Sequence, residues 1–238
     1  MASKFSIKTT SSFFLVLCLT VILLFIFSCF AADPDPLQDF CVADLNSTII
    51  VNGYPCKPVS QVTSNDFFFS GLMIEPSTAN PLGHGVRIGN VSTFPGLNTL
   101  GLTVNRFDLA PGGVTPIHKH PRASEVNIVL KGKVISGFIS TSDVLYLKVQ
   151  KAGELFVIPR GLVHFAANVG RHKAVLIAGY NSQLPGFAFI PNNLFASSPT
   201  IPNYILAKNF RVDEKFIAII KSKFARNGAL AIANEEDI

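Results

Sequence analysis

Short apolar segments separated by glycine, proline and asparagine make up most of the chain. This punctuation is typical of strands joined by tight turns, and it predicts an all-β sandwich or barrel. The apolar stretches 126–130 and 134–135 flank Gly132, which predicts a hairpin. A further apolar run, Leu155 to Ile158, is expected to be a buried strand that ends at the turn 159–161.

The first 31 residues depart from this pattern. Lys4 and Lys8 precede an almost wholly apolar run over residues 13–30, and small residues occupy the −3 and −1 positions before Ala32. These are features of a secretory signal peptide, so residues 1–31 are expected to be removed. The apolar run is long for a signal peptide, which leaves an uncleaved anchor as the alternative. Cleavage is preferred, and it predicts a secreted protein without a stable membrane anchor.

The C-terminal end has a different period. Apolar residues recur there at helical spacing, after Asp213 as a capping residue and before Gly228 as a stop signal. The predicted apolar stripe consists of Phe216, Ile219, Ile220 and Phe224. Such a stripe needs a partner surface, and the simplest expectation is that it packs on the chain's own barrel.

Length and charge limit the class of protein. Removal of the leader leaves 207 of the 238 residues, which is enough for one domain with a sizeable core. The mature chain carries 18 basic and 15 acidic residues, a net charge of +3. The excess is mild and unclustered, so the sequence predicts no nucleic-acid partner. It would allow weak attraction to an acidic cell-wall polysaccharide.

Cysteines and glycosylation sequons also fit a secreted protein. Two of the four cysteines lie in the leader, and Cys41 and Cys56 remain. An even pair in a secreted chain predicts a disulfide, which would contribute roughly 3 kcal/mol in the chain-entropy model. Two buried thiols are the alternative. Asn46 and Asn90 each begin an Asn-x-Ser/Thr sequon and are candidate glycosylation sites.

A first candidate metal motif contains His118 and His120. Residues two apart on a strand point to the same face, so both imidazoles can enter one cavity. Pro121 interrupts regular strand pairing, which allows the chain to restart with Glu125 facing inward as well.

A second candidate motif supplies His164, on a strand whose inward positions include Ala166 and Asn168. Three imidazoles and one carboxylate form a mixed N/O site, which suits a redox-active divalent metal with open coordination positions better than a structural zinc. The other two histidines outside this set, His84 and His172, are interpreted as surface or loop residues.

These segments closely resemble the two signature motifs of the cupin superfamily. The stretch HKHPRASE at 118–125 is similar to the germin version, as is DPDPLQDFCVAD at 33–44. Further similar stretches are PGLNTLG at 95–101, YNSQLPG at 180–186 and IKSKF at 220–224. The resemblance implies a single jelly-roll barrel over residues 32–238, with C-terminal helices from about residue 203. It also implies manganese as the cofactor, the apoplast or cell wall as the location, and a homohexamer in which C-terminal helices clasp neighbouring subunits of a trimer of dimers.

The resemblance implies two reactions. Some germins oxidise oxalate with dioxygen, and several germin-like proteins dismute superoxide. Asn105 matches an asparagine of the oxalate-oxidising germins, but Thr115 and Ala166 stand where those proteins have asparagine and glutamine. The sequence therefore predicts an intact metal site, superoxide as the favoured substrate, and doubtful activity on a small dicarboxylate. The alternative is a non-catalytic receptor, binding or wall protein; nutrient storage is disfavoured, because storage cupins usually have two barrels and degraded metal motifs.

Overall fold

A computed structural model describes residues 16–20, 38–51 and 53–226. The chain divides into two units, Met1–Ala31 and Ala32–Ile238. In the first unit residues 16–20 are helical. The predicted cleavage site and most of the apolar run lie outside the described residues. No helix in the described ranges is long and apolar enough to cross a bilayer.

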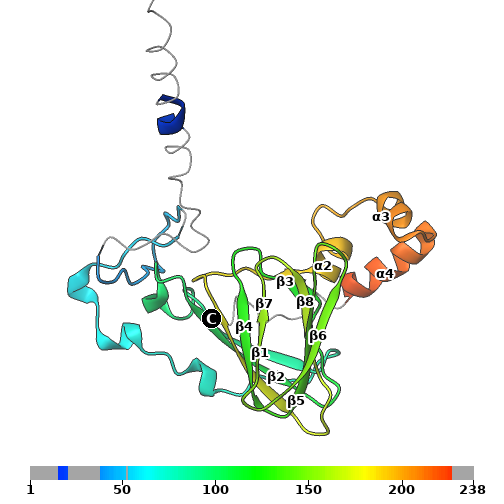
Figure 1. Cartoon of the computed structure of the whole chain (residues 1–238), viewed down its shortest axis with the longest axis horizontal. Coiled ribbons are helices and arrows are strands. Elements are labelled where there is room, and N and C mark those ends of the chain that lie inside the picture. The colour runs from blue at the N-terminus through cyan, green and yellow to red at the C-terminus, as the bar shows by residue number, and fades with distance from the viewer. Residues whose placement is uncertain (1–15, 21–37, 52, 227–238) are drawn as a thin grey trace, which may run out of the picture. The chain divides into compact units, whose positions relative to one another are not determined.

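The second unit is built from two antiparallel sheets that face each other (Figure 1). The first sheet has the order β1 (His84–Gly89), β2 (Thr103–Leu109), β9 (Ala174–Tyr180), β4 (Glu125–Lys131) and β7 (Leu155–Ile158). The second has the order β10 (Ala188–Phe189), β3 (His118–Lys119), β8 (Val163–Asn168), β5 (Lys133–Ile139) and β6 (Leu145–Lys151). The predicted all-β jelly roll is confirmed.

The core lies between the two sheets. Strands β8 and β9 alternate strictly between buried and half-buried residues, because successive side chains point to opposite faces. The buried apolar cluster consists of Phe107, Leu109, Ala123, Val129, Val134, Ala166, Ala174, Leu176, Ala178 and Tyr180. Gly132 has φ +90° between β4 and β5, in the predicted hairpin. A side chain at this φ would be strained, so glycine suits the turn.

The strand β7 is not buried as expected. Leu155 is 62% exposed and Val157 is 60% exposed, whereas Ile158 is buried. The prediction was wrong because the second sheet covers only one face of β7, so Phe156 and Ile158 alternate toward the core while Leu155 and Val157 point away from it. An unbroken apolar run therefore does not mean burial on both faces here.

The segment before β1 has little regular structure apart from three short 3₁₀ helices, and a fourth follows between β1 and β2. They are η1 (Val59–Gln61), η2 (Ser64–Phe67), η3 (Gly71–Met73) and, between β1 and β2, η4 (Pro95–Leu97). A disulfide joins Cys41 to Cys56, next to a backbone bridge between Ala43 and Cys56. Lys57 and Asp66 form an ion pair at 2.6 Å in the same segment. Covalent and polar links thus hold this region where strand pairing does not.

Three helices follow the barrel: α2 (Ile190–Phe195), α3 (Asn203–Phe210) and α4 (Glu214–Arg226). Helices α3 and α4 stand apart from the two sheets (Figure 1). They bury Leu206, Ala207 and Ile217 in a small cluster of their own. The expectation that the stripe packs on the barrel was therefore wrong. Phe216 and Ile219 are 61% and 55% exposed, because the buried face of α4 is centred on Ile217.

Candidate metal centre

The four predicted ligands come together from three strands and lie in or next to β3, β4 and β8. His118 lies in β3 directly opposite His164 of β8, and His120 follows two residues later. Glu125 is the first residue of β4, after the turn at Pro121. All four side chains are buried, and one ligand atom from each lies within 4.8 Å of the others. Among the described residues, this is the group of histidines and acids that could hold a metal ion.

Backbone carbonyls fix the orientation of all three imidazoles. The Nδ1 atoms of His118, His120 and His164 lie 2.7, 2.7 and 2.8 Å from the carbonyl oxygens of Pro116, Gly186 and Leu162, respectively. A carbonyl only accepts, so each Nδ1–H must donate. The lone pair of each neutral imidazole is then on Nε2, the atom available to a metal.

The Glu125 carboxylate meets two of these lone pairs. Its Oε2 lies 3.1 Å from His120 Nε2 and 3.2 Å from His164 Nε2, and all three atoms are buried without a conventional hydrogen-bond partner. Burial acts to raise the pKa of Glu125, but a proton on the facing nitrogens of His120 and His164, in the place that a metal ion would take, lowers the pKa below its usual range. The carboxyl is therefore ionised.

The neutral state of His118 supports the same arrangement. Burial first, and then the neighbouring His164 and His120, lower the pKa of His118 to about 3. The Glu125 carboxylate and the three Nε2 atoms place several acceptors together in a buried space. A cation among them would resolve this conflict, so the residues present fit a divalent metal.

A small cavity adjoins the ligands. Its volume is about 20 Å³, and its polar lining comes from Thr115, Asn127 and three of the metal-binding candidates, His118, Glu125 and His164. A space of this size holds about one water molecule. A species that occupies this cavity beside the ligands would be of similar size.

The hydroxyl of Thr115 is already engaged. Its Oγ1 accepts a hydrogen bond from the Ala166 backbone N–H at 2.8 Å and lies 3.4 Å from the Ala166 carbonyl oxygen. The side chain thus ties the segment before β3 to β8 and does not direct a donor into the cavity. Ala166 adds a methyl group to the lining. Neither residue therefore supplies a side-chain amide to the cavity.

Asn105 lies further from the cavity. It is fully buried on β2, and its Oδ1 accepts from the Gly89 N–H at 3.1 Å. Its Nδ2 is buried without a partner. Near it, the ring of Tyr180 packs edge-on against His120 with centroids 4.7 Å apart. Burial, and then the charge of Glu125, raise the pKa of Tyr180 well above its usual value, so the phenol stays neutral.

Asn127 is a site residue that the sequence reasoning missed. Its Nδ2 lies 3.5 Å from Glu125 Oε1, and its Oδ1 is buried without a partner. A carboxylate only accepts, so the amide nitrogen must face Glu125 and the amide oxygen must face away from it. The signal was available: Asn127 is two residues after Glu125 on one strand, and therefore on the same face.

The remaining histidines differ from each other. His172 is exposed in the bend before β9, as expected. His84 is instead a half-buried residue at the start of β1 that lines a larger cavity with His118, so its interpretation as a surface or loop residue was wrong. The error arose because the strand that carries His84 begins at the histidine itself, and its inward direction depends on the pairing with β2.

Comparison with known proteins identifies the family. Residues 70–218 match the family model described as Cupin. Germin-like protein subfamily T member 2 of Arabidopsis thaliana is 53% identical over 214 residues, which cover 90% of this chain and 94% of that protein. The chain belongs to the germin-like proteins of the cupin family.

Solved structures of related proteins extend this comparison. An oxalate oxidase in complex with the substrate analogue glycolate matches with a TM-score of 0.80 and 46% identity, over 82% of this chain and 100% of that one. Peruvianin-I, described as a cysteine peptidase from Thevetia peruviana latex, matches with a TM-score of 0.65 and 48% identity, over 67% of this chain and 98% of that one. In this germin-like chain both described cysteines of the cupin unit, Cys41 and Cys56, are joined in the disulfide. They offer no thiolate for peptidase chemistry.

Proposed function

We propose that this germin-like chain is a secreted manganese protein of the plant extracellular matrix that dismutes superoxide and has little or no oxalate oxidase activity. The observation that carries this proposal is the cavity beside the ligands, which is about 20 Å³ in volume and has no free amide donor from Thr115 or Ala166. It suits a species of two heavy atoms better than a dicarboxylate.

The protein's own residues account for binding and selectivity. His118, His120, His164 and Glu125 would hold the metal, with the imidazoles aligned by backbone carbonyls. When bound, manganese would supply one-electron redox chemistry. Dismutation converts two superoxide ions and two protons into dioxygen and hydrogen peroxide, so it needs proton delivery but little orientation of the substrate. The Asn127 side chain donates a hydrogen bond to Glu125 through Nδ2, and its Oδ1 has no partner. An amide oxygen can accept a hydrogen bond from a proton donor, but it cannot donate one to an oxalate oxygen.

Oxidation of oxalate needs hydrogen-bond donors that orient the substrate and stabilise its developing charge. Loss of one well-placed donor to a developing charge typically costs 10²–10³ in rate, about 3–4 kcal/mol. Two such donors, at the positions of Thr115 and Ala166, are missing here. The relationship to an oxalate oxidase therefore supports the shared metal site more strongly than the shared substrate.

Location and assembly are part of the same proposal. The leader-like N-terminus and the Cys41–Cys56 disulfide support secretion to the apoplast. Exposed apolar side chains on β7 and α4, including Leu155, Val157 and Phe216, support a homo-oligomer, and the family suggests a hexamer. The Asn46 side chain is exposed, whereas Asn90 accepts a hydrogen bond from Ser92 N–H at 2.9 Å, so Asn46 is the better glycosylation candidate.

The test compares two activities in fully manganese-loaded mature protein. Wild type should dismute superoxide and oxidise oxalate weakly or not at all. The variant Thr115→Asn/Ala166→Gln should gain oxalate oxidation if the missing amides are responsible. Strong oxalate oxidation by wild type would overturn the argument. Absence of both activities would favour the second candidate, a non-catalytic binding or wall protein, for which the larger cavity beside His84 is the specific support.

A further inference from the structure

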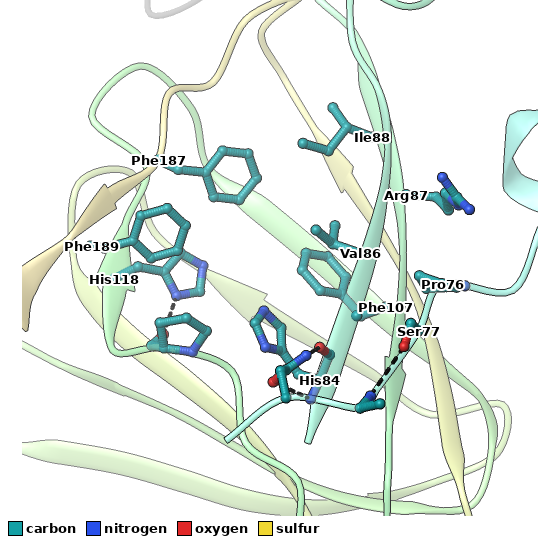
Figure 2. A pocket seen from close by; sticks show the side chains of 14 residues that line it. Pro76, Ser77, His84, Val86, Arg87, Ile88, Phe107, His118, Phe187 and Phe189 are labelled. Carbon is teal, nitrogen blue, oxygen red and sulfur yellow. Dashed lines mark hydrogen bonds between the residues drawn. The ribbon is translucent and has the colours of Figure 1, made fainter. Parts of the chain in front are cut away.

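A second and larger cavity lies where the barrel is open. Strand β1 is the edge of one sheet and β10 is the edge of the other, and these two edges are not paired with each other. The space between them holds a cavity of about 300 Å³, which reaches His118 (Figure 2). His118 and Phe107 also line the small cavity beside the metal ligands, so these two side chains lie between the two spaces.

One face of β1 forms a wall of this cavity. His84, Val86 and Ile88 alternate along the strand and share a face, and all three line the cavity. Val86 is opposite Phe107 in the pairing of β1 with β2. Arg87, on the intervening position, points away from the centre of the cavity (Figure 2).

The opposite wall is aromatic. The rings of Phe187 and Phe189 stack with centroids 5.9 Å apart, and each lies 5.9 Å from the His118 imidazole. An apolar cavity of about 150 Å³ is enough to bind benzene, and small-molecule pockets begin at about 300 Å³. The volume and the lining therefore fit a flat molecule with one or two rings.

The polar groups of the lining narrow the ligand class. The Asn80 side chain is used by backbone groups, because its Nδ2 donates to the His84 carbonyl oxygen and its Oδ1 accepts from Leu82 N–H. Ser77 Oγ accepts from Ala79 N–H at 3.2 Å. His118 Nδ1 is bound to Pro116. His84 Nδ1 and Arg87 Nε, in contrast, are buried without a partner.

His84 offers a neutral group to a ligand. Burial lowers the pKa of His84, so its imidazole is uncharged at neutral pH. A neutral imidazole nitrogen donates or accepts according to its tautomer, and a hydroxyl group can match either. Arg87 is the one residue with a fixed charge in the described lining, and its guanidinium is directed away from the centre of the cavity (Figure 2), so a carboxylate beside His84 would face no cation. Burial of an unpaired carboxylate there would be strongly unfavourable.

We propose that the cavity between β1 and β10 binds a neutral phenolic compound, with its ring between Val86 and Phe189 and its hydroxyl on His84 Nδ1. This binding site is separate from the metal ligands and does not depend on the proposed reaction. It touches the metal centre through the ring face of His118, whose Nε2 remains directed toward the other ligands.

The experiment uses three probes of one shape: 2-naphthol, naphthalene and 2-naphthoate. Each is titrated calorimetrically into mature protein with and without manganese. We expect saturable binding of 2-naphthol in both forms, about tenfold weaker binding of naphthalene because it lacks the hydroxyl, and at least hundredfold weaker binding of naphthoate. Because the metal-free protein is included, failure of dismutation does not affect this result.

Variants assign the binding to this cavity. Val86→Phe should fill the space and weaken 2-naphthol at least tenfold, whereas the same change at the exposed Val169 should have no effect. His84→Phe should abolish the preference for naphthol over naphthalene while leaving naphthalene binding intact. Retained manganese content and an unchanged unfolding midpoint show that each variant is folded, and a variant that fails this check is replaced by Val86→Leu, with a smaller loss expected.

Three results would overturn the proposal. The first is the absence of saturable naphthol binding. The second is naphthol binding that is indifferent to both the Val86 and the His84 substitutions, which would place the ligand elsewhere. The third is tightest binding of naphthoate, and only with manganese present, which would indicate a carboxylate bound by the metal.

Discussion

The metal centre and the C-terminal helices differ in how completely a single chain buries their side chains. At the metal centre every ligand is buried, and each imidazole is held by a carbonyl of the same chain. In the helices Ile217 is buried, but Phe216 and Ile219 on the same helix remain exposed. The first region is complete within one chain, and the second offers apolar surface that one chain does not cover. The difference indicates that metal binding and assembly can be perturbed separately.

The largest expected effect is the loss of a metal ligand. His120→Ala leaves three ligands, so metal affinity should fall by well over 100-fold, beyond the loss of 10–100-fold that removal of a supporting group typically causes. Metal analysis after dialysis against a weak chelator measures this. The exposed His172→Ala is the matched control and should retain metal. Equal loss from His172→Ala would show that the ligand set is wrong.

A double change on the exposed face of α4 tests the other region. Phe216→Ser/Ile219→Ser should weaken assembly by roughly 3–6 kcal/mol, because full burial of each such side chain contributes about 1.5–3 kcal/mol. Sedimentation velocity reports the oligomeric state, and Lys215→Ser/Lys223→Ser on the same helix is the control. Metal content should not change. A wild-type protein that sediments as a monomer at micromolar concentration would contradict the proposed oligomer.

A third substitution tests whether the buried face of α4 stabilises the helices while its exposed face does not. Ile217→Ala removes buried volume from the helical cluster and should destabilise it by about 2–5 kcal/mol, whereas Ile219→Ala should cost far less in the isolated subunit. Hydrogen exchange should show faster opening of α3 and α4 with unchanged protection in β8 and β9. If the barrel opens with the helices, the two regions are not independent.

The smallest expected effect concerns the support of the metal centre. Thr115→Val removes the acceptor of the Ala166 N–H and should lower the free energy of unfolding by about 1–3 kcal/mol, because a buried donor loses its partner. Chemical denaturation measures this, with the exposed Thr141→Val as the control. Retained metal would show that Thr115 supports the strand and does not serve the ion directly.

Prediction from the sequence succeeded where local spacing determines geometry. The pair His118 and His120, the break at Pro121 and the alternation in β8 are all short-range features, and the structure has them as expected. Helix α3 begins at Asn203, close to the expected start of the helical region. The same spacing argument could have predicted that Asn127 shares a face with Glu125.

The features that escaped prediction depend on contacts between distant segments. Leu155 is exposed because it lies on the face of β7 that the second sheet does not cover, and nothing in its own sequence records which face that is. The direction of the His84 side chain depends on its pairing with Leu109, 25 positions away along the chain. The cavity between β1 and β10 is formed by edges that are far apart in sequence. The periodicity of a segment predicts its secondary structure, but which of its residues are buried depends on how the sheets pack together.

The three carbonyl anchors of the imidazoles have an evolutionary consequence. Pro116, Gly186 and Leu162 contribute main-chain oxygens, so the ligands are directed by the backbone, which at Gly186 has the φ of +72° that favours glycine. Mutation can therefore replace the neighbours of the metal while the ligands keep their direction. Substitutions at positions such as 115, 127 and 166 then leave the carbonyl anchors in place, so a lineage can explore new substrates without first losing its ion.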